Sequence, residues 1–299
     1  MVLFKGAATA LVTPFRSGKV DYESLGRLID WQTESGIDGL VLCGTTGEAS
    51  TLTDKEHLEV VRYGLRRAQR AAKDHGKSIP VLAGAGSNDT AHALDLAKAL
   101  EQEGVDGLLL VTPYYNKCTD AGLIRHYTYL ADRLEIPILL YSVPGRTGVN
   151  ISPAVVKELC THPNICGIKE ASGNMAQVVE IARYCSDDFA LYSGNDDLVV
   201  PLLSVGGSGC ISVLSNLLPA ATSRMVHAFL EGDTEAAKGL QLELKPLIDA
   251  LFCEVNPIPV KEALTLLGHI EGEYRLPLCP PSLASSRKIR AALESVGLL

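Results

Sequence analysis

The stretch IPVLAGAGSNDTAHALDLAKALEQEGVDGLLLV, residues 79–111, contains the repeating unit from which the fold can be predicted. It begins with an apolar run at 79–83 and continues with apolar residues every three or four positions at 90–103. A second apolar run follows at 107–111. Continuous apolar runs are typical of parallel strands that are covered on both faces, and the spacing between them is typical of a helix. The stretch therefore predicts a strand, a helix and a second, parallel strand.

The same unit repeats in both directions along the chain. Eight apolar runs alternate with helical patterns, at residues 7–12, 39–43, 79–83, 107–111, 137–141, 165–169, 189–193 and 209–213. Helical patterns at 22–35 and 54–74 fit this alternation, and Thr53 with Glu56 forms a capping box before the second of them. Ser152 precedes a proline at a first helical position. Eight strand–helix units predict an α/β fold, a (β/α)8 TIM barrel; an open doubly wound sheet is the alternative, but eight strands favour closure.

The barrel is expected to close near residue 225, which divides the chain into two parts. Residues 1–225 would form the (β/α)8 catalytic barrel, and residues 226–299 a C-terminal helical region. Helical patterns at 223–251, 260–267 and 284–297 predict that extension. A chain of 299 residues is long for one domain, but α/β barrels reach about 250 residues as a single unit.

Composition excludes several classes of protein. Hydrophobic residues make up 46% of the chain and charged residues 21%, so a large core can form and disorder is excluded. The net charge of −8, without a run of basic residues, is unlike a nucleic-acid binder. The first residues are typical of a strand rather than a signal peptide, and no apolar run is long enough to span a membrane. We expect a cytoplasmic protein whose eight cysteines are reduced, buried thiols.

Two polar residues end neighbouring predicted strands, where a barrel carries its chemistry. Lys169 follows an apolar strand and would point into a dry barrel mouth. Desolvation disfavours the ammonium form, and a neutral lysine is a nucleophile that forms imines with carbonyl compounds. Tyr141 ends the preceding strand, so both side chains can reach one cavity and the phenol can relay protons. Taken singly, a solvated lysine and a packing tyrosine are the more common interpretations.

Two loops at the same barrel face could bind carboxylates. Gly44-Thr45-Thr46-Gly47 follows a strand, and its backbone N–H groups can bind a small anion, although tight turns also require glycine. Arg146, in a loop after another strand, has the fork geometry for bidentate capture of a carboxylate, although most arginines lie at the surface.

Resident cofactors are not predicted. Gly84-Ala-Gly86 lacks the third glycine of a dinucleotide fingerprint. The seven histidines are scattered without metal-ligand spacing, so no metal site can be identified, although a site assembled from strand-end carboxylates stays open.

A set of motifs spread over essentially the whole chain identifies a family resemblance. The motifs are Gly6-x-x-x-Ala10-Leu-Val-Thr-Pro-Phe15, Gly44-Thr-Thr-Gly-Glu48, Val111-Thr-Pro-Tyr-Tyr-Asn116, Tyr141-Ser-Val-Pro-Gly-Arg146-Thr, Gly167-Ile-Lys-Glu170 and Asn256-Pro-Ile-Pro-Val-Lys261. Together they resemble the dihydrodipicolinate synthase family of pyruvate-dependent, Schiff-base-forming barrel aldolases.

The resemblance implies an enzyme, a lyase that condenses pyruvate with L-aspartate 4-semialdehyde to give 4-hydroxy-tetrahydrodipicolinate. This is a step of diaminopimelate and lysine biosynthesis. It implies that Lys169 forms the imine with pyruvate. It also implies that Tyr141, Thr46 and Tyr115 form a proton relay, with Tyr115 entering from a neighbouring subunit. A cytoplasmic homotetramer, a dimer of dimers, without metal or organic cofactor is expected on the same basis.

The binding residues implied by the resemblance come from the same strand ends. The backbone of Thr45 and Thr46 would hold the pyruvate carboxylate, and Arg146 the carboxylate of the second substrate. Gly194 and Ile211 would line the pocket.

Two alternatives are less consistent with these residues. Sister aldolases, such as N-acetylneuraminate lyase and 2-keto-3-deoxy sugar acid aldolases, share the lysine and the tyrosine, but the Pro144-Gly-Arg-Thr loop matches the synthase. A catalytically silent barrel that senses a keto acid would not need Lys169, Tyr141, Tyr115 and Thr46 together.

The resemblance also implies a possible allosteric lysine site, at the matching positions Ala49, Ser50, Asp54, His57, Asn88, His92 and Tyr114. His57, Asn88 and Tyr114 agree with the lysine-sensitive pattern. His92 stands where an acidic residue normally meets an amino group of the effector, and Asp54 where histidine is common. We therefore expect weak or absent feedback by lysine, unless Asp54 compensates by turning inward.

Overall fold

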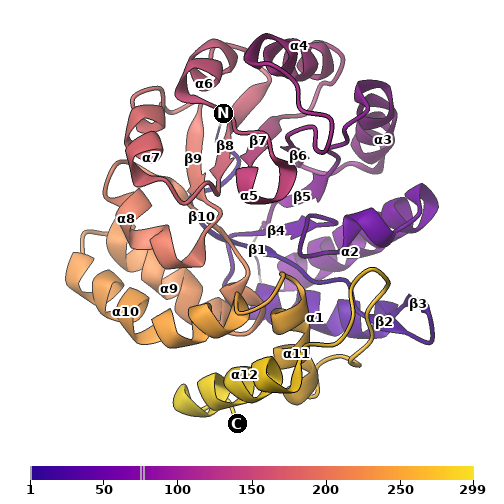
Figure 1. Ribbon diagram of the computed structural model, residues 1–299, viewed down its shortest axis with the longest axis vertical. Coiled ribbons are helices and arrows are strands. Elements are labelled where there is room, and N and C mark those ends of the chain that lie inside the picture. The colour runs from indigo at the N-terminus through magenta and orange to yellow at the C-terminus, as the bar shows by residue number, and fades with distance from the viewer. Residues whose placement is uncertain (1, 75, 77) are drawn as a thin grey trace.

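The computed structural model describes residues 2–74, 76 and 78–299, and its centre is a closed parallel barrel (Figure 1). The barrel strands are β1 (Gly6–Ala10), β4 (Gly39–Leu42), β5 (Val81–Gly84), β6 (Gly107–Val111), β7 (Ile138–Ser142), β8 (Ile165–Glu170), β9 (Ala190–Ser193) and β10 (Gly209–Ser212). β1 pairs with both β4 and β10, which closes the ring. The predicted TIM barrel is confirmed, and each of the eight apolar runs contributes one strand.

Helices surround this ring (Figure 1). They are α1 (Tyr22–Glu34), α2 (Asp54–Asp74), α3 (Thr90–Glu103), α4 (Asp120–Ala131), α5 (Pro144–Thr147), α6 (Pro153–Leu159), α7 (Met175–Ala182), α8 (Val199–Leu203), α9 (Pro219–Leu230), α10 (Thr234–Leu251), α11 (Ile258–Leu266) and α12 (Leu283–Ser295). Short 3-10 turns are η1 (Ala49–Thr51), η2 (Asp196–Leu198) and η3 (Leu214–Asn216). Thr53 and Glu56 exchange the two hydrogen bonds of a capping box before α2, and Ser152 caps α6, as predicted.

Side chains of the strands divide between two apolar layers, because successive residues point to opposite faces. The inner layer fills the barrel and includes Ala8, Val41, Leu139 and Ile211. The outer layer lies between the sheet and the helices and carries most of the core. The C-terminal ends of the strands are therefore fixed on a rigid, packed support.

The helical pattern at 223–251 is divided in the structure, and this corrects the sequence-based expectation. α9 starts earlier, at Pro219, and α10 starts at Thr234. Gly232 between them has φ +98°, and Asp233 caps α10 by accepting from the amide of Ala236. α9 packs on β1 and β10 and thus completes the barrel.

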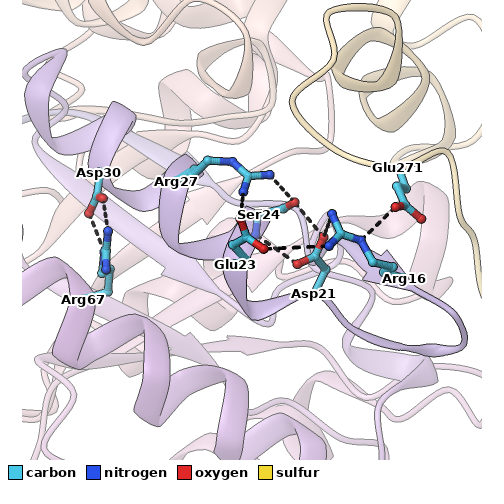
Figure 2. A network of polar contacts seen from close by, with 8 residues as sticks. All are labelled: Arg16, Asp21, Glu23, Ser24, Arg27, Asp30, Arg67 and Glu271. Atoms are coloured by element: carbon cyan, nitrogen blue, oxygen red, sulfur yellow. Dashed lines mark hydrogen bonds and ion pairs between the residues drawn. The ribbon is translucent and has the colours of Figure 1, made fainter.

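A small hairpin that the sequence analysis did not predict connects β1 to α1. Its strands, β2 (Phe15–Arg16) and β3 (Lys19–Val20), have two residues each. Figure 2 shows Arg16 between Asp21, the N-cap of α1, and Glu271 of the C-terminal region, at 3.0 and 2.8 Å. Asp30 of α1 pairs with Arg67 of α2 in the same view. Charged contacts therefore join this hairpin to the C-terminal region and α1 to α2.

All eight cysteines are free, but the expectation that they are buried is only partly correct. Cys43, Cys166 and Cys210 are buried, whereas Cys279 is exposed and the other four are half-buried. None of the described helices combines the length and apolar character that a membrane span needs.

Candidate active site

Lys169 and Tyr141 lie side by side at the C-terminal end of the barrel. They are register partners on β8 and β7, and Lys169 is also opposite Tyr192 on β9. The Nζ atom of Lys169 is 4.4 Å from the centroid of the Tyr141 ring. Both residues are 6% exposed, although lysine is rarely buried without a partner. The strand order thus places an amine and a phenol together in a largely buried position.

Gly194 lies against the lysine stem, and Ile211 belongs to the inner layer of the barrel. A Cβ atom at Gly194 would lie 3.0 Å from Cε of Lys169 and 2.8 Å from Cβ of Ala171. Glycine is therefore needed here for the lysine side chain to occupy its observed place. Ile211 is fully buried in the inner layer that also contains Tyr141.

The loop after β4 brings Thr45 and Thr46 to the same end of the barrel. Thr46 is buried, and its Oγ1 accepts a hydrogen bond from Nδ2 of Asn256 at 3.0 Å. The loop turns back sharply: the amide of Glu48 donates to the carbonyl of Thr45, and Glu48 has φ +53°. A non-glycine residue in this left-handed conformation is strained and needs support from its surroundings.

A cavity of about 990 Å³ opens beside these residues. Thr45, Tyr141 and Arg146 line it, whereas Lys169 and Thr46 do not and instead lie buried beside them. Arg146 is exposed on α5, and its Nη2 donates to the carbonyl of Asn256 at 3.1 Å. The geometry combines a buried amine, two hydroxyl groups and a guanidinium near one cavity, which suits reactions of small keto acids.

Tyr115 lines the same cavity from its outer side. Its side chain is 85% exposed and its φ is +71°, so a strained backbone presents a large aromatic ring to solvent. Exposed tyrosines of this kind are enriched at protein interfaces.

The candidate effector residues line the same cavity. Its lining includes Ala49, Ser50, Asp54, His57, Asn88, His92 and Tyr114. Nε2 of His92 is 3.2 Å from both carboxylate oxygens of Asp54. The two residues that depart from the lysine-sensitive pattern therefore form an ion pair when His92 is protonated. Burial lowers the pKa of His57 to about 4, and its Nε2 has no hydrogen-bond partner among the described residues.

Three polar residues at or near the loop after β4 were not predicted as site residues from the sequence. Glu48 and Lys261 form an ion pair with 2.5 Å between Oε1 and Nζ, and both side chains are fully buried. Burial raises the pKa of Glu48, and the neighbouring Lys261 ammonium opposes this rise. Asn256 is the third. All three occur in the motifs quoted above, but nothing in the local pattern of Asn256 and Lys261 places them against Thr46 and Glu48, which are 210 and 213 residues away.

A metal centre finds no support in the side-chain arrangement. Across residues 2–74, 76 and 78–299, no group of three or more His, Cys, Asp and Glu side chains converges in a way that could hold a metal ion.

Comparisons with known proteins give a consistent result over the full length. Residues 3–296 match the model of the dihydrodipicolinate synthetase family. A 4-hydroxy-tetrahydrodipicolinate synthase of Caldicellulosiruptor saccharolyticus is 52% identical over 100% of this chain and 99% of its own length.

Solved structures agree with this result. A dihydrodipicolinate synthase of Thermotoga maritima has a TM-score of 0.95 and 42% identity over 99% of this chain and 100% of that one. An Acinetobacter baumannii dihydrodipicolinate synthase, solved in complex with pyruvate, has a TM-score of 0.94 and 41% identity over 99% of both chains.

Proposed function

The chain belongs to the dihydrodipicolinate synthetase family and is a lyase with 4-hydroxy-tetrahydrodipicolinate synthase activity in lysine biosynthesis, and on this premise we propose that Lys169 is its Schiff-base residue. The observation that carries this proposal is the position of the buried Lys169 amine, 4.4 Å from the ring centroid of Tyr141 on the neighbouring strand. A buried amine next to a phenol has the nucleophile and the proton-transfer group that imine formation requires.

The proposed reaction begins at the keto carbon of pyruvate. The Lys169 amine attacks this carbon, a C–N bond forms, and the keto oxygen leaves as water after proton transfers through Tyr141, Thr46 and Tyr115. Loss of a methyl proton then gives an enamine, because the imine nitrogen accepts the electron pair. The enamine carbon attacks the aldehyde carbon of L-aspartate 4-semialdehyde; the aldehyde oxygen takes up a proton and becomes a hydroxyl group, and the imine of Lys169 forms again. The amino group of that substrate finally attacks the imine carbon, which closes the ring and releases Lys169.

Two groups of residues are proposed to hold the substrates. The backbone of Thr45 and Thr46 binds the pyruvate carboxylate at the start of a sharp turn, where N–H groups are available to an anion. Arg146 binds the carboxylate of the second substrate, and its exposed position on α5 at the cavity supports this role. Gly194 and Ile211 shape the space around Lys169, where a Cβ at position 194 would meet the lysine stem.

We further propose a homotetramer, a dimer of dimers, in which Tyr115 enters the site of a neighbouring subunit. The strong exposure of Tyr115 and its strained backbone support this, because a single subunit gives the ring little apolar cover.

The decisive experiment is a coupled assay with pyruvate and L-aspartate 4-semialdehyde, made on the wild type and on Lys169→Ala. We expect condensation by the wild type and its loss in the variant. A sister aldolase would instead prefer to cleave sugar acids, and a non-catalytic keto-acid sensor would bind pyruvate without turnover.

A further inference from the structure

A polar network lies on the outer side of β7 and β8, behind the strand ends that carry Tyr141 and Lys169. Ser142 and Glu170 are the next residues of the two strands, and they are register partners. Because successive strand residues point to opposite faces, the side chains of this pair point away from the barrel interior. Both residues are buried. The same two strand ends thus carry the proposed reacting groups inside the barrel and a polar pair outside it.

Asn150 and Gln177 connect this polar pair. Asn150 lies in the loop between α5 and α6, and Gln177 lies in the first turn of α7. The hydroxyl of Ser142 donates to Oδ1 of Asn150 at 3.2 Å, and the amides of Asn150 and Gln177 bond reciprocally at 2.7 and 3.1 Å. Nε2 of Gln177 also donates to Oε1 of Glu170 at 3.0 Å. These contacts join β7 to β8 outside the barrel.

Glu170 is a buried carboxylate without a cationic partner among the described residues. It is 3% exposed, and its two oxygens accept from the amide of Ser172 at 3.2 Å. Burial raises the pKa of Glu170, and the hydrogen bonds from Ser172 and Gln177 oppose this rise. Because the carboxylate accepts, Nε2 of Gln177 must face it, which fixes the orientation of that amide. Stability alone does not require this arrangement, since burying a carboxylate costs free energy.

We propose that Gln177 is a positioning residue of the reaction, which holds the ends of β7 and β8 so that Lys169 lies beside Tyr141. The backbone ladder between the two strands ends just beyond these residues, where the amide of Ala171 donates to the carbonyl of Ser142 at 2.9 Å. Past this point the side-chain network restrains both strand ends. Displacement of a reacting group by about 1 Å can lower a rate by about 100-fold. The inference rests on the proposed roles of Lys169 and Tyr141.

Two variants of Gln177 break the connection in different ways. Gln177→Leu removes the amide at similar size, and Gln177→Glu sets a carboxylate against that of Glu170. In Gln177→Glu/Glu170→Gln the donor and the acceptor exchange places, so the connection can form again.

Gln32→Leu is the matched control. Gln32 of α1 is buried and accepts from the hydroxyl of Thr9 on β1 at 2.5 Å, so it also joins a helix to the outer side of a barrel strand. β1 is not a neighbour of β7 or β8 in the ring. This variant should lose stability without a change in the rate of imine formation.

The primary measurement is the rate of imine formation with pyruvate, followed by borohydride trapping at timed intervals. We expect Gln177→Leu and Gln177→Glu to lower this rate and kcat/KM for pyruvate by about 10-fold, and the exchange variant to recover most of the loss. KM for L-aspartate 4-semialdehyde should change little, because α5, which carries Arg146, is held separately. The hydroxyl of Thr112 donates to Oγ1 of Thr147 on that helix at 2.9 Å.

A double-mutant cycle with Tyr141→Phe separates positioning from a general structural effect. In that background Gln177→Leu should lower the trapping rate by less than about 2-fold, because the phenol that the network places beside Lys169 is absent. Urea unfolding shows whether each variant is folded at the assay temperature. Gln177→Glu and its exchange variant carry the test if Gln177→Leu does not fold.

The possible contradictions fall on two levels. A wild-type trapping rate in the folded Gln177 variants, or losses that multiply in the Tyr141→Phe background, would overturn the positioning role. An equal loss of trapping rate in Gln32→Leu would also overturn it. Absence of an adduct at Lys169 in the wild type would instead overturn the proposed function itself.

Discussion

Replacing Lys261 with methionine is expected to destabilise the protein strongly, because Glu48 would be left buried without its partner. Both side chains are fully buried, and Nζ lies 2.5 Å from Oε1. At an effective dielectric constant of about 20, two unit charges at this distance attract by about 7 kcal/mol, and the cost of burying both charges offsets much of this. Removal of one partner from such a pair typically costs about 3–5 kcal/mol. We expect a loss of this size for Lys261→Met.

Urea unfolding, measured at matched protein concentrations, tests this value. Glu48→Gln/Lys261→Met should recover much of the loss, because no unpaired charge remains. Lys238→Met is the control, since Lys238 forms an exposed ion pair with Glu235 on α10 and such pairs typically contribute below about 1 kcal/mol.

The pH dependence separates a charge effect from lost packing. Without Lys261, the pKa of Glu48 rises further, so the folded variant binds a proton that the unfolded chain has lost at neutral pH. The deficit relative to wild type should therefore shrink as the pH falls from about 7 to about 5. A deficit below about 1 kcal/mol, or one that does not vary with pH, would show that the unpaired charge is not the cause of the loss.

Three further predictions concern binding and pH. Arg146→Ala should lower kcat/KM for L-aspartate 4-semialdehyde by roughly 30-fold or more, as expected for a lost charged partner, and a change confined to pyruvate kinetics would contradict its role. Burial lowers the pKa of His57 and of His126 to about 4, below the unfolded value of 6.5. The stability that the two neutral histidines allow is therefore complete above pH 6.5 and is lost as the pH falls toward 4. Urea unfolding should show a free energy of unfolding that is lower by about 2 kcal/mol for each histidine at pH 5. A free energy of unfolding that stays constant over this range would contradict the prediction. Lysine titrated at subsaturating pyruvate should inhibit weakly or not at all, because His92 already engages the Asp54 carboxylate; strong inhibition below about 1 mM, roughly −4 kcal/mol of binding free energy, would contradict this.

The barrel was predictable because its signals are local. Each strand is a short apolar run, and each helix has its own periodicity and caps, so strand number and order follow from the sequence. The break between α9 and α10 was missed because the apolar spacing continues across it. Gly232 is nevertheless typical of a helix end, and the N-cap Asp233 is typical of a helix start. The hairpin strands β2 and β3 are too short to show a period.

Site residues could be predicted from the sequence only where they lie at the ends of strands. Lys169 and Tyr141 were expected to meet because neighbouring parallel strands end at one face, and their register confirms that they are adjacent. Asn256 and Lys261 could not be placed in this way, because their partners Thr46 and Glu48 are 210 and 213 residues away. The roles of the site residues, the tetramer and the division near residue 225 stay predictions.

Reductive trapping of the imine tests the proposed chemistry of Lys169 without relying on any other residue. The wild-type protein is incubated with pyruvate and borohydride, digested, and analysed by mass spectrometry for the position of the added mass. We expect one adduct, on Lys169, and none in Lys169→Ala. An adduct on another lysine, or an unlabelled wild-type protein that still condenses both substrates, would overturn the assignment.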